Sequence, residues 1–272
     1  MGVAVSTAVF DGHPLNVGLD TLADMGVRWV EPAFIRGYVD FTEADFETPA
    51  AKRLARAISE RGLCASALSA HMNLADDGAV EALRRRISCA STLGAPFLIT
   101  NAGPKAGEAR IKACIEAVIP ALEDAGITLA LENPGHGSGD LAGTASDACA
   151  LVDDLGADRV GLNVDVGNFA TYLGGVDPMP EIRQAMPRAV HVHLKDYRAD
   201  GSNWIFTALG EGSLNFPAIL EATGGVPRAI ELPLRLRRPG RKDPVREEML
   251  SLGSIRESLR RSIAEVTSCV KG

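Results

Sequence analysis

The chain has 272 residues, of which 46% are hydrophobic and 23% are charged, and its formal net charge is −7. This composition is typical of a globular protein and excludes a wholly disordered or collagen-like chain. No stretch approaches the roughly 18 consecutive apolar residues of a membrane span. An acidic chain is also a poor general binder of phosphate backbones, so we expect neither a membrane nor nucleic acid as a partner.

The first ten residues, MGVAVSTAVF, lack the cationic region of a secretory signal and favour a first buried strand. The alternative is the permissive myristoylation pattern, which Gly2 and Ser6 satisfy. Five cysteines are scattered without paired spacing: Cys64, Cys89, Cys114, Cys149 and Cys269. We therefore expect free thiols and a cytoplasmic location, and neither a disulfide framework nor a zinc cluster.

A glycine recurs where an amphipathic helical stretch gives way to an apolar strand. It is found at Gly26, Gly62, Gly94, Gly126 and Gly156. Glycine closes a helix in the left-handed conformation at the lowest cost, so each position predicts a helix-to-strand turn. In the helix expected before Gly126, Pro120 should produce a kink.

Eight apolar segments alternate with these helices. They are AVSTAVF (4–10), RWVEPAF (28–34), LCASALSAH (63–71), APFLITNAG (95–103), ITLALEN (127–133), ADRVGLNVDVGN (157–168), AVHVHLKD (189–196) and RAIELP (228–233). Strict alternation indicates parallel strands with right-handed crossovers. We predict an α/β fold, a (β/α)8 TIM barrel, as a single domain over residues 1–272 with a last helix over about 244–268. A doubly wound open sheet is the alternative, but no glycine-rich phosphate fingerprint follows the first strand.

Four successive strands of this barrel end with an ionisable residue on the inward face, because side chains alternate between the two faces of a strand. These residues are Glu132, Asp165, His193 and Glu231. Three converging buried carboxylates repel one another and lose hydration unless a cation joins them. One imidazole and three carboxylates suit a divalent ion, foremost Mn²⁺, with Mg²⁺ or Co²⁺ as alternatives. The other interpretation is four ordinary acidic or polar residues at the starts of loops.

The segments LALEN, NVDVGN, HVHLKD and IELP, in this order and spacing, resemble the xylose-isomerase-like TIM-barrel family of sugar phosphate isomerases and epimerases. The resemblance extends over nearly the whole chain, is strongest at 126–233, and includes GEGSLNFPAIL at 210–220. It implies that Glu132, Asp165, His193 and Glu231 bind the metal. It also implies that Glu132 and Glu231 act as the catalytic acid/base pair.

Three positions depart from the pattern of the family's epimerases. Asn168 stands where they usually have His, and Ser138 stands where they have a second Glu. Arg198 lies close to, but out of register with, their Arg after the seventh strand. The metal-binding set therefore carries over, whereas the substrate-recognition set does not.

Further residues at the expected mouth of the barrel are candidates for substrate binding, since loops at this end carry function. They are His71, Glu31, Asn101, His136, Asn168 and Lys195. The alternative interpretation is that these are loop residues whose polar groups are hydrogen-bonded within the protein or solvated. His191 points inward one layer deeper than His193, so we expect it to support the site or the core rather than to bind the metal.

The segment 233–248 follows the eighth strand and is rich in arginine and lysine. Loops after the last strands of a barrel often hold phosphate, so this segment is a candidate for an acidic substrate group. A solvated loop or a subunit contact is the alternative.

These features predict a divalent-metal-dependent isomerase or epimerase of a sugar or sugar phosphate, which acts through a metal-bound enediolate between two glutamates. A lyase that dehydrates an inosose or keto sugar at the same metal site is the main alternative. An abasic-site endonuclease-like hydrolase and a partner-dependent subunit are less favoured. The expected partner is a small sugar or sugar phosphate, and a homo-oligomer is left open.

Overall fold

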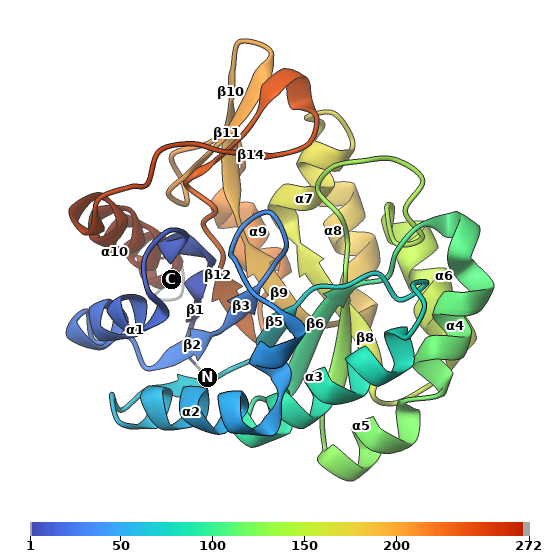
Figure 1. The fold of residues 1–272 in the computed structure, drawn as a ribbon. Helices are drawn as coiled ribbons and strands as arrows, with labels where there is room; N and C mark the ends of the chain where they lie inside the picture. Colours follow the sequence, from blue (N-terminus) through green and yellow to red (C-terminus); the bar gives the residue numbers. More distant parts are fainter. Residues whose placement is uncertain (1, 269–272) are drawn as a thin grey trace.

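The computed structural model describes residues 2–268, and a ring of parallel strands forms its centre (Figure 1). The strands are β1 (Ala4–Ser6), β2 (Trp29–Glu31), β3 (Ala33–Phe34), β4 (Cys64–Ala65), β5 (Leu68–Ala70), β6 (Phe97–Asn101), β7 (Thr128–Glu132), β8 (Val160–Asp165), β9 (Ala189–Leu194) and β12 (Arg228–Ile230). β2 and β3 are two pieces of one barrel strand, and β4 and β5 are two pieces of the next. These two strands pair through β2 with β4 and through β3 with β5. β1 pairs with both β2 and β12. The pairing order ends at β3 and β4, which belong to the same two barrel strands as β2 and β5, so the ring is closed and the predicted (β/α)8 barrel is confirmed.

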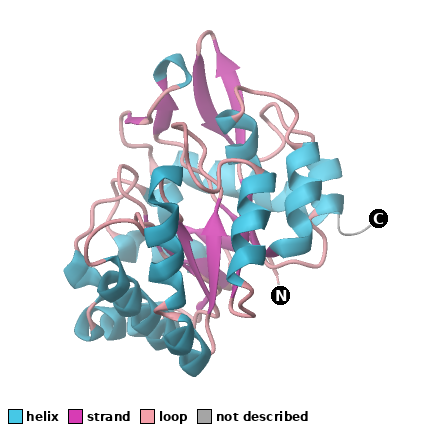
Figure 2. Ribbon diagram, turned by 90° about the vertical axis from the view of Figure 1, so that its right-hand side faces the viewer, coloured by secondary structure: helices cyan, strands magenta, loops and turns pink. Residues whose placement is uncertain are grey.

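Helices surround the strands on the outside (Figure 2). They are α1 (Leu15–Asp24), α2 (Thr48–Ser59), α3 (Ala79–Leu93), α4 (Glu108–Glu116), α5 (Ile119–Ala125), α6 (Ala145–Leu155), α7 (Val166–Tyr172), α8 (Met179–Ala185), α9 (Phe216–Ala222) and α10 (Leu252–Ser268). Short 3-10 helices are η1 (Thr7–Phe10), η2 (Glu43–Phe46), η3 (Lys105–Gly107), η4 (Met186–Arg188) and η5 (Pro239–Arg241). The apolar face of each long helix packs on the outward side chains of the strands, which forms the main core.

The turns between helix and strand follow the prediction. All five recurring glycines have a positive φ, between 56° at Gly156 and 73° at Gly26. Pro120 has a stronger effect than a kink, since α4 and α5 are separate helices with Pro120 in the first turn of the second.

A second, antiparallel sheet lies beyond one end of the barrel, at the top of Figure 1. It consists of β10 (Asp196–Asp200), β11 (Asn203–Thr207), β13 (Leu236–Arg238) and β14 (Val245–Arg246). Its own apolar cluster contains Tyr197, Trp204 and Phe206. The sequence did not predict this sheet.

Three predicted boundaries were wrong. The expected last helix over 244–268 begins only at Leu252, because residues 245–246 pair with β13 as β14. The expected sixth strand stops at Asp165, because the Asp165 side chain accepts a hydrogen bond from the Asn168 backbone and starts α7. The first strand is also shorter than predicted, since residues 7–10 form η1.

The basic segment 233–248 forms ion pairs both within itself and with another part of the chain. Arg235 and Arg246 both form ion pairs with Asp11, and Arg237 forms one with Glu247. These contacts agree with a structural role for the segment. Cys64, Cys89, Cys114 and Cys149 are free thiols, whereas Cys269 lies outside the described residues. Among the described helices, none is long and apolar enough to cross a membrane.

Candidate metal centre

The four strand-end residues converge inside the barrel. Glu132 ends β7, Asp165 ends β8, His193 lies near the end of β9, and Glu231 directly follows β12. Each offers a ligand atom, and these atoms all lie within 4.8 Å of one another. None of the four residues is more than 2% exposed. The pleat thus places side chains from four segments of the chain in one buried cluster.

The donors in this cluster suit a hard divalent cation. His193 Nδ1 lies 2.9 Å from Glu132 Oε2, 3.9 Å from Asp165 Oδ2 and 3.8 Å from Glu231 Oε2. Glu231 Oε1 is buried and has no hydrogen-bond partner among the described residues. A buried carboxylate oxygen without a partner is costly, and a cation bound by three carboxylates and one imidazole would satisfy it.

Lys195 places a buried ammonium against two of these carboxylates. Its Nζ lies 2.7 Å from Asp165 Oδ2 and also contacts Glu231 Oε2. It also donates a hydrogen bond to Asn168 Oδ1 at 3.2 Å. The side chain was predicted to bind substrate, and it does line the cavity described below.

Two asparagines fix the orientation of Glu132. Asn163 Nδ2 donates to Glu132 Oε2 at 2.6 Å, and Asn168 Nδ2 donates to Glu132 Oε1 at 3.1 Å. The sequence analysis named Asn168 as a candidate for substrate binding but did not name Asn163. The inward position of Asn163 on the sixth predicted strand could have indicated it. Tyr38 was also missed, because it lies in a loop after β3 where no pattern marks it.

The charges in the cluster shift several pKa values in opposite directions. Burial raises the pKa of Asp165 to about 6, with Glu132 and Glu231 adding to the rise and Lys195 opposing it. Burial acts the same way on Glu132, but the His193 and His71 imidazoles bring the pKa of Glu132 below its ordinary value. Burial lowers the pKa of His193, yet Glu31 and Glu132 raise it by more. Such divergent carboxylate pKa values are typical of catalytic sites.

A cavity of about 740 Å³ opens onto the cluster. Its wall contains Glu132, Glu231, His71, Asn101, His136, Asn168 and Lys195. His71 Nε2 lies 3.6 Å from Glu132 Oε2 and 3.0 Å from Ser69 Oγ. Burial, together with the charges of Arg238 and Lys195, lowers the pKa of His136 to about 4, so this imidazole is neutral at pH 7. The structure therefore gathers five of the six predicted substrate-binding residues around one cavity.

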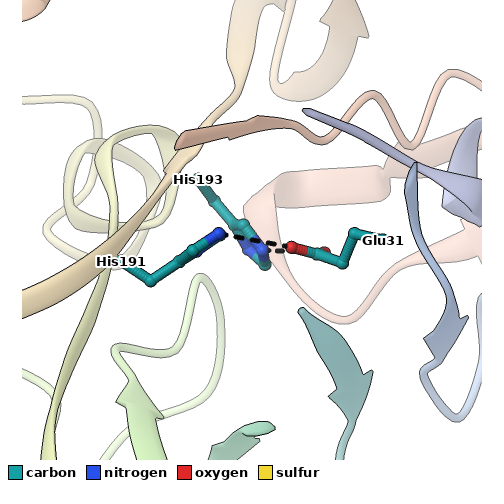
Figure 3. A group of neighbouring side chains, drawn as sticks. All are labelled: Glu31, His191 and His193. Carbon is teal, nitrogen blue, oxygen red and sulfur yellow. Dashed lines mark hydrogen bonds and ion pairs between the residues drawn. The ribbon is translucent and has the colours of Figure 1, made fainter. Parts of the chain in front are cut away.

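Glu31 is the sixth, and it lies elsewhere. The side chain is fully buried, is absent from the cavity wall, and contacts His193 and His191 (Figure 3). Its expected place at the rim is therefore wrong, because β2 directs this carboxylate into the closed interior of the barrel. His191 is buried two residues before His193 on β9, and it is not part of the cluster of Glu132, Asp165, His193 and Glu231.

A family model described as the xylose isomerase-like TIM barrel matches residues 19–224. The chain belongs to this family. The match includes Glu132, Asp165 and His193 and stops before Glu231. No curated protein matches the sequence.

Several solved structures share the fold over nearly the full length of both chains. An L-ribulose 3-epimerase superimposes with a TM-score of 0.73 at 19% identity, covering 100% of this chain and 96% of the other. A xylose isomerase-like TIM barrel protein from Mycobacterium smegmatis in complex with magnesium gives 0.72 at 18%, covering 99% and 97%. The probable 3-DHS dehydratase AsbF from Bacillus anthracis gives 0.70 at 14%, covering 98% and 99%. At these identities the likeness shows the fold alone.

Proposed function

We propose that this protein is a divalent-metal-dependent isomerase or epimerase of a sugar or sugar phosphate. The observation that carries the proposal is the buried cluster of Glu132, Asp165, His193 and Glu231 at one cavity, with Glu132 and Glu231 on the cavity wall. The similarity to L-ribulose 3-epimerase supports the same class of reaction.

Glu132, Asp165, His193 and Glu231 would hold the ion, for which Mn²⁺ is the expected choice and Mg²⁺ or Co²⁺ the alternatives. A bound divalent ion supplies Lewis acidity that polarises a substrate carbonyl and acidifies the adjacent C–H. Asn163 and Asn168 hold the Glu132 carboxylate by one hydrogen bond to each oxygen, so its orientation is fixed before substrate arrives.

The two wall glutamates are placed to move the proton. Glu132 and Glu231 come from β7 and from the end of β12, which are separated in the ring by β8 and β9. A substrate bound in the cavity would meet both carboxylates, since both line its wall. One glutamate removes the α-proton, and the other returns a proton to the neighbouring carbon or to the opposite face.

Glu132→Gln and Glu231→Gln should each lower the rate of α-proton exchange by about 10²–10⁴-fold, because the amide cannot take up the proton. The measurement is NMR in D2O on the Mn²⁺-loaded enzyme with a panel of ketoses, aldoses, inososes and their phosphates. Glu257→Gln, a control at an exposed glutamate of α10 that does not line the cavity, should exchange at the wild-type rate. Wild-type exchange rates in both glutamine variants would refute the acid/base assignment.

One observation favours the lyase alternative. The Lys195 ammonium contacts Glu231, which gives the site a second proton donor beside its acid/base group. A departing β-hydroxyl needs such a donor. The same panel separates the two reactions, because an isomerase or epimerase incorporates solvent deuterium without losing water, whereas a dehydratase yields the unsaturated product.

A further inference from the structure

A second polar cluster shares His193 with the proposed metal centre. Glu31, His191 and His193 offer ligand atoms within 4.8 Å of one another (Figure 3). All three side chains are at most 1% exposed. Glu31 does not line the cavity, so the proposed reaction leaves the role of this buried carboxylate unexplained.

The two nitrogens of His193 face different carboxylates. Nδ1 lies 2.9 Å from Glu132 Oε2 and points into the four-residue cluster, whereas Nε2 lies 2.9 Å from Glu31 Oε1. A metal ligand needs an unprotonated nitrogen, and the proton of a neutral imidazole then sits on the other one. Glu31, which as a carboxylate can only accept, therefore favours the tautomer with the proton on Nε2 and the lone pair of Nδ1 directed at the centre.

Glu31 makes this contact to His193 rather than to His191. Asn163 Nδ2 donates to a Glu132 oxygen, so the Asn163 Oδ1 atom is left to accept from His191 Nδ1 at 2.9 Å. His191 Nε2 remains 3.7 Å from Glu31 Oε2, which is beyond hydrogen-bond distance, and this Oε2 has no hydrogen-bond partner within residues 2–268. The one hydrogen bond of the Glu31 carboxylate in the described chain thus goes to His193.

We propose that Glu31 is a positioning residue of the metal centre, which fixes the ring orientation and tautomer of His193 and raises the basicity of Nδ1. The inference rests on the proposed function, since it requires that His193 bind a metal. Carboxylates that accept from the far nitrogen of a ligating histidine orient it in this way, and their removal typically weakens metal binding by about 10–100-fold.

The first test is Mn²⁺ affinity, measured by competition with a fluorescent chelator on the full chain after EDTA treatment and dialysis. Glu31→Gln keeps the size of the side chain but removes its charge, and it should weaken Mn²⁺ binding by about 10–100-fold. Asp11→Asn is the matched control, because Asp11 is a buried carboxylate paired with Arg235 and Arg246 and not with the cluster. The control should bind Mn²⁺ like the wild type.

The second test needs no variant. Long-range ¹H–¹⁵N spectra of Zn²⁺-loaded, ¹⁵N-histidine-labelled wild type should show His193 metal-bound at Nδ1 and protonated at Nε2. Zinc on Nε2, equal Mn²⁺ affinity in Glu31→Gln and wild type, or an equal loss in Asp11→Asn would each overturn the inference. If the wild type binds metal but Glu31→Gln binds equally well, only this inference fails. A wild type that binds neither ion overturns the proposed function as well.

Discussion

At the scale of a single residue, the ammonium group of Lys195 balances part of the negative charge of the buried carboxylates. Its ammonium is fully buried against Asp165 and Glu231, two of the carboxylates that a divalent ion would also contact. Buried carboxylates need such a cation, because their hydration is lost and their mutual repulsion is not screened. Lys195 and a bound metal therefore stabilise the same oxygens.

Lys195→Met should lower the free energy of unfolding of EDTA-treated protein by about 3–5 kcal/mol, because it leaves two buried carboxylates without their partner. Added Mn²⁺ should raise the melting temperature of this variant by more than that of the wild type. Thermal unfolding with EDTA and with Mn²⁺ measures both effects. Lys105→Met, at an exposed ion pair with Asp147, should cost less than about 1 kcal/mol. An equal Mn²⁺ response in Lys195→Met and wild type would contradict the shared-oxygen explanation.

At the scale of elements, an ion pair attaches η2 to α3 beside the cavity. Arg86 Nη1 and Nη2 donate to the Glu43 carboxylate, at 3.0 and 2.7 Å. The Arg86 side chain is almost fully buried over the Phe46 ring. The hydrogen bonds from Arg86 lower the pKa of Glu43 to about 2 from an ordinary value of 4.5. The cavity wall includes both residues, so this contact shapes the mouth of the site.

The lowered pKa of Glu43 predicts a dependence of stability on pH. Because the folded-state pKa lies below the unfolded one, the contribution is complete above about pH 5 and is lost as the pH falls through 4.5 toward 2. Glu43→Gln should remove that part of the acid sensitivity. It should cost about 1–2 kcal/mol at pH 7, since the Glu43 side chain is 44% exposed and solvent screens the pair.

Urea unfolding of Glu43→Gln and wild type at pH 7 and at pH 3 tests this expectation, and the two proteins should differ less at pH 3. The control is Glu81→Gln in α3, whose 67% exposed side chain pairs with Arg84. Its free energy of unfolding should stay within about 0.5 kcal/mol of the wild type. A difference for Glu43→Gln that is the same at both pH values would contradict the pKa argument.

At the scale of the whole molecule, the proposed metal centre joins segments from Glu132 to Glu231 that meet only when the barrel closes. A ligand that binds only the folded ring stabilises it by mass action. Mn²⁺ at about 100 times its dissociation constant should therefore add about 2.7 kcal/mol to the free energy of unfolding, and EDTA should reverse the gain.

Differential scanning fluorimetry over a Mn²⁺ series measures this stabilisation. Asp165→Asn removes one ligand carboxylate and should greatly reduce the rise in melting temperature at the same Mn²⁺ concentration. A melting temperature of the wild type that is independent of Mn²⁺ would count against the centre.

The sequence by itself determined the barrel and the composition of its centre. Helix-closing glycines and the two-residue period of strands are local properties, so Gly94 and Gly126 placed the turns and strand parity brought Glu132 and Asp165 to the inward face. The predicted family and fold are confirmed, whereas the proposed roles of the site residues stay predictions.

Only the tertiary structure decided contacts that depend on closure of the ring. Glu31 and His193 are 162 residues apart in the chain, and no local pattern brings the carboxylate to Nε2 of the imidazole. The second sheet likewise arises because residues 236–238 pair with a hairpin at 196–207, and such pairing depends on geometry across the barrel rather than on propensity. Local chemistry therefore selects the residues of the proposed centre, and long-range packing selects which of their atoms face one another.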